Sequence, residues 1–187
     1  MVFQKLAALI SGDNNKKMLK SANALIPIIN EFFNKFSSEF KSKDDFVKHL
    51  NYLKDQHLKE GKTLNDLLPE TFGLVKAASK FLIDSEFDLL GTQTIWNMVY
   101  FDVQLIGGIA IHNGNIAEMR TGEGKTFVCT LPCILNSLTG RPVMLVAVND
   151  YLAERDATWM SRLYNFFDLK VGVNKSGLDI SDKKQVY

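Results

Sequence analysis

Apolar residues in the first part of the chain recur at helical spacing. Two stripes have members three or four residues apart, as on one face of an amphipathic helix. The first stripe comprises Leu25, Ile29, Phe33, Phe36 and Phe40, and the second Phe46, Leu50, Leu53 and His57. Gly61 ends the second helix, and Thr63 and Asp66 resemble a capping pair. Pro69 suits the first turn of a third helix, which runs through Phe72, Val75 and Leu82.

The extreme N-terminus predicts a short helix of its own. Its apolar face comprises Val2, Phe3, Leu6, Leu9 and Ile10. Ser11, Gly12 and Asp13 are expected to end this helix, and Lys16, Lys17 and Lys20 follow. Such a face beside lysines can lie on an anionic membrane surface or a partner, or dock on its own domain. Spacing alone favours docking.

Residues 84–94 are acidic and lack helical spacing, so we expect a loop or linker there. This segment separates a helical N-terminal part, residues 1–94, from a second part, residues 95–187.

The second part alternates strand and helix patterns. Residues 116–119, 143–148 and 169–173 are predicted strands, and 143–148 is an uninterrupted apolar run typical of a buried parallel strand. Helices are predicted over residues 125–138 and 151–167, the latter capped by Asn149 and Asp150. A βαβ alternation predicts an α/β fold with a parallel sheet covered on both faces.

A candidate phosphate-binding loop joins the first predicted strand to the first of these helices. Its residues are Arg120, Thr121, Gly122, Glu123, Gly124, Lys125 and Thr126. Glycines let backbone N–H groups curl round an anion, and the helix N-terminus behind them favours negative charge. Lys125 is placed for the β- and γ-phosphates and the Thr126 hydroxyl for Mg²⁺. The alternative is a plain glycine turn with an exposed lysine.

Acidic residues near the loop are few. Glu123 would repel a triphosphate unless turned outward, so we assign it to solvent and give it no catalytic role. Asp150 ends a predicted strand and is a candidate Mg²⁺ ligand, although its place at a helix start is explained by capping. Met119 stands where the usual phosphate-loop pattern begins with glycine. Arg155 and Arg162 are open as arginine fingers.

Composition narrows the function classes. Of 187 residues, 46% are hydrophobic and 23% charged, which excludes a disordered tail. A net charge of +1 gives no strong basic field for nucleic acid. Cys129 and Cys133 are read as small core residues of a reducing compartment. No apolar run is long enough to span a bilayer.

Three blocks together resemble the SecA family, the ATPase motors of bacterial protein export. The blocks are residues 101–108, with Gln104, residues 116–126, with the phosphate loop, and residues 148–157, with Arg155. Met119 in place of the first glycine is also what the family shows. Residues 65–70 and 77–80 fit more loosely, and residues 84–94 look like an insertion relative to the family.

The resemblance implies a fold and a binding site. The fold is a RecA-like, DEAD-type P-loop NTPase sheet, incomplete here and preceded by the helical segment. Gln104 matches the family's adenine-reading glutamine, with Met98 and Phe101 against the adenine ring. Residues from Arg120 to Thr126 would hold the phosphates of ATP, Thr126 the Mg²⁺, and Arg155 would lie near the nucleotide.

The resemblance also implies partners and a location. These are preproteins, a membrane export channel and anionic lipid met through residues 1–12, with no nucleic acid and with a homodimer for the full-length protein. The protein would be cytoplasmic and peripheral on the cytoplasmic face of the inner membrane. The Asp-Glu-Ala-Asp block would fall beyond Tyr187, so this chain alone is expected to lack the hydrolytic acid. Alternatives are a fragment of a DEAD-box-like nucleic-acid helicase and a non-catalytic module that docks on membrane or channel.

Overall fold

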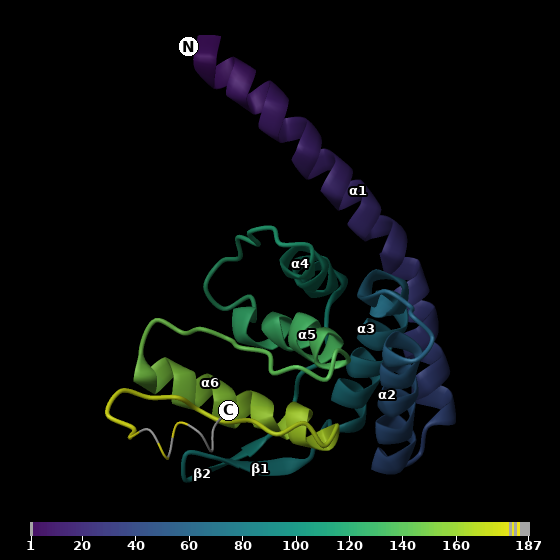
Figure 1. The fold of residues 1–187 in the computed structure, drawn as a ribbon, viewed down its shortest axis with the longest axis vertical. Helices are drawn as coiled ribbons and strands as arrows, with labels where there is room; N and C mark the ends of the chain where they lie inside the picture. Colours follow the sequence, from purple (N-terminus) through teal and green to yellow (C-terminus); the bar gives the residue numbers. More distant parts are fainter. Residues whose placement is uncertain (1, 180, 182, 184–187) are drawn as a thin grey trace.

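The computed structural model describes the backbone of residues 2–179, 181 and 183, and side chains from residue 15 onward within these ranges. Six helices and one hairpin of two strands make up the described fold (Figure 1). The helices are α1 (Val2–Glu39), α2 (Lys43–Leu58), α3 (Leu64–Phe81), α4 (Asp102–His112), α5 (Lys125–Ser137) and α6 (Asp150–Phe166). The strands are β1 (Glu86–Leu89) and β2 (Thr92–Ile95).

Helix α1 is much longer than the sequence pattern predicts. It runs without interruption through Ser11, Gly12 and Asp13, so the predicted end at these residues is wrong. One glycine inside a helix costs only about 1 kcal/mol relative to alanine, which the long helix tolerates. The N-terminal part of α1 extends away from the other helices (Figure 1). The side chains of the predicted apolar face within residues 1–12 lie outside the described residues.

The predicted stripes on α1 and α2 are confirmed as core positions. Ile29, Phe36, Phe46 and Leu53 are fully or almost fully buried, because each faces the neighbouring helices. Leu25, Phe33 and Phe40 pack against this core from its edge. His57 is the exception, because it is only half-buried at the edge of the core, and its Nδ1 lies 2.7 Å from the carbonyl oxygen of Lys62.

Helix α3 begins at the predicted cap but earlier than its proline suggests. The backbone N–H of Asp66 donates to Thr63 Oγ1 at 3.2 Å, and Asp66 Oδ2 accepts from the Thr63 N–H at 2.9 Å. Thr63 Oγ1 also donates to Asp66 Oδ2 at 2.7 Å, and this bond, with the one from the Thr63 N–H, holds the pKa of Asp66 below its usual range. Pro69 therefore lies inside α3, not in its first turn.

A glycine lets α1 and α3 approach closely. A Cβ added at Gly73 would lie 2.5 Å from Phe32 Cβ and 2.9 Å from the carbonyl oxygen of Ile29. Helix α1 packs along α3 and also reaches α4, and α5 lies against both α3 and α4. The arrangement places α4 and α5, which flank the candidate loop, on the helical N-terminal part.

Residues 84–94, predicted to be a loop or linker, mostly form an antiparallel hairpin. Glu86 pairs with Ile95 and Leu89 with Thr92. Leu90 and Gly91 form the turn with φ values of +52° and +85°, and positive φ at both positions is the backbone that suits a tight hairpin. The prediction failed because leucine is a poor residue for that conformation and gave no turn signal.

The predicted parallel strands carry no strand hydrogen bonds within the described residues. Segments 116–119, 143–148 and 169–173 are coil, and 143–148 connects α5 to α6 as an extended thread (Figure 1). Ile116 is 97% exposed and Val146 is 91% exposed, so these apolar residues lack any covering layer. A strand needs a hydrogen-bonded neighbour, which periodicity cannot supply. Hydrophobic burial is concentrated instead among the helices.

Within the described residues, no helix is both long and apolar enough to cross a membrane.

Candidate functional site

The loop of residues 120–126 runs into the N-terminus of α5, as predicted. Gly124 is the residue before the helix and Lys125 is its first residue. Gly122 and Gly124 have φ values of +86° and +83°, in the left-handed region that favours glycine. The orphan N–H groups of the first helical turn therefore face an exposed loop, an arrangement that suits an anion.

The loop folds back on itself through its charged residues. Lys125 Nζ donates to the carbonyl oxygen of Arg120 at 2.9 Å. The Glu123 side chain is exposed, as expected for a residue turned outward. Its carboxylate accepts from the Arg120 N–H at 2.6 Å and so closes the loop on itself. Thr121 is also exposed. Lys125 is held by a single neutral carbonyl, which a phosphate oxygen can replace with a charge-assisted bond.

Gln104 lies directly against this loop. Its Nε2 donates to the carbonyl oxygen of Glu123 at 2.9 Å, and its Oε1 accepts from the Phe101 N–H at 3.0 Å. The residue is only 8% exposed. The structure thus brings the predicted adenine reader and the predicted phosphate loop together, across 19 residues of chain.

Gly124 is needed at this contact for a second reason. A Cβ at this position would lie 2.7 Å from Gln104 Nε2. At Gly122, by contrast, an added Cβ would meet nothing within 4 Å. The two loop glycines share a backbone conformation, and only Gly124 also makes room for the glutamine.

The segment before α4 is anchored by aromatic residues. The Trp96 indole N–H is shared between the carbonyl oxygens of Ser79 at 3.1 Å and Met98 at 3.0 Å. The Tyr100 ring stacks on Phe127 of α5 with centroids 3.7 Å apart. Sequence reasoning passed over these rings, although an aromatic cluster before a helix start is a packing signal.

The predicted adenine-contacting residues differ in exposure. Phe101 is 72% exposed, so its ring is open to a ligand. Met98 is half-buried and packs against the core. Both flank the turn that leads into α4, where Gln104 lies.

The Thr126 hydroxyl is oriented by an aspartate that sequence reasoning did not single out. Thr126 Oγ1 donates to Asp156 Oδ2 at 3.2 Å. The other carboxylate oxygen, Asp156 Oδ1, accepts from Arg155 Nε at 2.8 Å and Nη2 at 2.6 Å. Arg155 thus comes close to the loop through Asp156. The sequence signal that could have indicated this contact is the adjacent Arg155–Asp156 pair on the helix that Asn149 caps.

Asp150 is bonded to the segment after α6, and Asp156 is the acid that contacts Thr126. Asn149 caps α6 by accepting from the Leu152 N–H at 2.9 Å, which confirms the predicted cap. Asp150 Oδ2 accepts from the Ser176 N–H at 3.0 Å. Among the described residues, no three His, Cys, Asp or Glu side chains form a metal-binding group.

The two cysteines lie four residues apart on α5 and are free, as expected. Burial raises the pKa of both the Cys129 and the Cys133 thiol. They are therefore protonated and unreactive near neutral pH, in keeping with a packing role.

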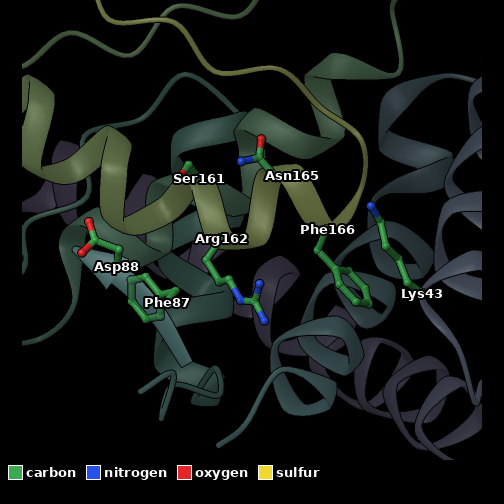
Figure 2. A pocket seen from close by; sticks show the side chains of 7 residues that line it. All are labelled: Lys43, Phe87, Asp88, Ser161, Arg162, Asn165 and Phe166. Atoms are coloured by element: carbon green, nitrogen blue, oxygen red, sulfur yellow. The ribbon is translucent and has the colours of Figure 1, made fainter. Parts of the chain in front are cut away.

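A cavity of about 390 Å³ lies between α6, β1 and the start of α2, away from the phosphate loop. Figure 2 shows Arg162 projecting into it between Phe87 and Phe166. Arg162 Nε donates to Ser85 Oγ at 3.3 Å. Arg162 therefore lies with the hairpin, whereas Arg155 lies with the phosphate loop.

Comparison with known proteins agrees with the resemblance. The model of the SecA DEAD-like domain matches residues 6–187. The protein translocase subunit SecA of Nitratidesulfovibrio vulgaris is 44% identical over 178 residues, which are 95% of this chain and 19% of that protein. The Variovorax paradoxus subunit is 44% identical, over 95% of this chain and 17% of that protein.

A third relative matches along the whole chain. The protein translocase subunit SecA of Solidesulfovibrio magneticus is 42% identical over 186 residues, 100% of this chain and 20% of that protein. The chain thus spans about a fifth of the length of these curated relatives. The match covers the phosphate loop, Gln104 and the helices that hold them, and on this evidence the chain belongs to the SecA DEAD-like domain family.

Proposed function

We propose that this chain is the ATP-binding N-terminal part of a SecA-type motor, which couples ATP hydrolysis to the export of unfolded preproteins. The observation that carries the proposal is the contact of Gln104 with the glycine-rich loop at the start of α5. An amide that can read a base edge and a helix N-terminus that can bind phosphate lie side by side, which would suit one nucleotide.

The loop would bind the phosphates with groups already near their working positions. The N–H groups that follow Gly122 and Gly124 would donate to phosphate oxygens at the positive end of the helix dipole. Lys125 would exchange the Arg120 carbonyl for a phosphate oxygen. Arg120, Thr121 and Glu123 supply the remaining backbone of the loop.

The Thr126 hydroxyl suits Mg²⁺ because its proton is already donated to Asp156, which leaves its oxygen lone pairs available. Bound Mg²⁺ would neutralise phosphate charge. Asp156 would hold the Thr126 hydroxyl in this orientation. It would also hold Arg155 beside it, from where the guanidinium would approach the nucleotide.

The adenine would lie at the start of α4. We infer that the Gln104 amide reads the base edge and that the exposed Phe101 ring covers one face. Met98 would add apolar contact from the edge of the core. Each Gln104 amide atom makes one bond here, so the second Nε2 N–H and the second Oε1 lone pair would be left to read adenine.

The exposed apolar segments support a RecA-like parallel sheet in the larger protein. Residues 143–148 form an apolar run that is largely uncovered, and Ile116 is nearly fully exposed. Exposed runs of this kind call for a covering partner. We infer that they become strands when neighbouring strands are supplied, with the sheet in the part from residue 95 onward and helices before it, in residues 1–94.

The larger protein's partners follow from the family. We propose preproteins and a membrane export channel as partners, and contact with anionic lipid through residues 1–12 at the cytoplasmic face of the inner membrane. We also propose that the full-length protein is a homodimer. The exposed Lys16, Lys17 and Lys20 on α1 support contact with an anionic surface.

The test is ATP-driven transport of a preprotein into inverted membrane vesicles by the full-length protein. Lys125→Ala should abolish both transport and ATP hydrolysis, because it removes the phosphate-binding ammonium. Lys170→Ala changes an exposed lysine outside the loop and should leave both intact. Transport that persists in Lys125→Ala would contradict the proposal.

A further inference from the structure

A buried lysine on α3 lies outside the nucleotide site and is not explained by it. Lys76 is only 7% exposed. An ammonium withdrawn from water is costly unless it is paired and hydrogen-bonded. The exposed Lys80, one turn further along the same helix, shows that a solvent-facing lysine was possible there.

Lys76 closes a triangle of hydrogen bonds between three helices. Its Nζ donates to Asn30 Oδ1 of α1 at 2.8 Å and to Asp102 Oδ1 of α4 at 3.3 Å. Asn30 Nδ2 completes the triangle by donating to the same Asp102 oxygen at 3.1 Å. The Lys76 ammonium also lies 5.0 Å from the centre of the Phe33 ring, a favourable cation–π position.

The triangle acts on the end of α4 that faces the nucleotide site. Asp102 is the first residue of α4, and Gln104 follows two residues later. The opposite part of α4 is fixed separately, because Gly108 packs so closely on Leu131 that an added Cβ would lie 2.9 Å from it. The contacts of Asp102 therefore add to the Gln104 hydrogen bonds and to the anchored segment before α4 in fixing the orientation of the first turn, which carries Gln104.

A chain of contacts follows from α1 to the phosphate loop. Asn30 and Lys76 hold Asp102, the turn that starts at Asp102 carries Gln104, and Gln104 Nε2 bonds the Glu123 carbonyl. Each link is a hydrogen bond or one helical turn, so a displacement of α1 relative to α3 would be transmitted to the glutamine.

We propose that the Asn30–Lys76–Asp102 triangle is a positioning device that aims Gln104 and thereby sets the preference for adenine over guanine. This inference rests on the proposed ATP site. Lys76 touches no nucleotide in this scheme, so it is a positioning residue. A purely structural triangle would affect stability without affecting the choice of base.

The test measures dissociation constants of the 187-residue chain for fluorescent ATP and GTP analogues in the presence of Mg²⁺. Lys76→Met keeps the apolar stem and removes the charge, so the ATP:GTP preference should fall about three- to tenfold. Asp102→Asn should act in the same direction. Lys76→Arg, unlike Lys76→Met, should retain most of the ATP:GTP preference, since it keeps a cation and hydrogen-bond donors at this position.

Lys80→Met is the matched control, because Lys80 lies on the same helix, 5.3 Å from the same Phe33 ring, and is exposed. It should leave the preference unchanged. Asn30→Ala retains the Lys76–Asp102 ion pair and serves as a second variant if Lys76→Met fails to fold. It should lower the preference by a smaller factor.

Two results overturn the inference in distinguishable ways. If the unaltered chain prefers ATP and folded Lys76→Met or Asn30→Ala retains the full preference, the positioning role is wrong and the nucleotide site stands. If the unaltered chain binds both nucleotides equally, adenine reading by Gln104 is wrong, and the inference fails with it.

Discussion

Gln104 Nε2 donates to the backbone carbonyl oxygen of Glu123 at 2.9 Å, which joins the start of α4 to the phosphate loop. The same amide accepts from the Phe101 N–H, so both of its polar atoms are engaged. The second Nε2 N–H and the second Oε1 lone pair are left for a ligand, which would share this amide with the loop. If the proposed ATP site is right, base recognition and phosphate binding share this one side chain and are coupled through it.

Gln104→Ala should weaken ATP binding by about tenfold, because it removes both the base contact and the restraint on Glu123. Gln104→Glu should weaken it further, since a carboxylate would face the Glu123 carbonyl with no proton to donate. Isothermal titration calorimetry measures both effects. Gln93→Ala, on the exposed face of β2, is the control. Equal affinities for all of these proteins would refute the coupling.

The two loop glycines form a matched pair. Gly122→Ala introduces backbone strain of roughly 1–2 kcal/mol at a positive φ, with open space around the new methyl group. Gly124→Ala adds a clash with Gln104 Nε2 to the same strain. We expect ATP affinity to fall more in Gly124→Ala than in Gly122→Ala, measured by the same titration. The reverse order would show that Gln104 does not lie against the loop in solution.

Gly73→Ala should destabilise the chain by about 1–3 kcal/mol, because the new methyl group would force α1 and α3 apart. The measurement is the urea midpoint of unfolding, followed by helical circular dichroism. Glu31→Ala changes an exposed residue of α1 and should leave the midpoint within experimental scatter. A stabilising effect of Gly73→Ala would contradict the close packing of α1 on α3.

Leu90→Asn should stabilise the hairpin by about 1 kcal/mol, since asparagine tolerates the left-handed backbone that Leu90 adopts at φ +52°. Gly91→Ala should act in the opposite direction, because Gly91 has φ +85°. Thermal unfolding midpoints distinguish the two. A drop in midpoint for Leu90→Asn would argue against this turn.

The features that were predicted correctly are those set by residues close together in the sequence. The stripes of Ile29, Phe36, Phe46 and Leu53, the Thr63–Asp66 cap and the loop before Lys125 are each set by residues a few positions apart. The end of the first helix was mispredicted because one glycine inside a long helix costs only about 1 kcal/mol and does not end it. The family resemblance was confirmed by the SecA domain match.

Tertiary contacts decided the rest. The hairpin escaped prediction because its turn places a leucine in a glycine-like conformation. The apolar run 143–148 has the composition of a strand, which is why it was predicted to be one. Among the described residues it has no hydrogen-bonded neighbour, so it does not form a strand there. Asp156 reaches Thr126 across 30 residues of sequence, a contact that no spacing rule reveals.

The most direct test of the proposed ATP site is equilibrium binding of ATP to the 187-residue chain with Mg²⁺ present. We expect one saturable site that is lost in Lys125→Ala and retained in Lys170→Ala, with the helical circular dichroism of all three proteins unchanged. ATP binding that survives Lys125→Ala, or folded chain that binds no ATP, would contradict it.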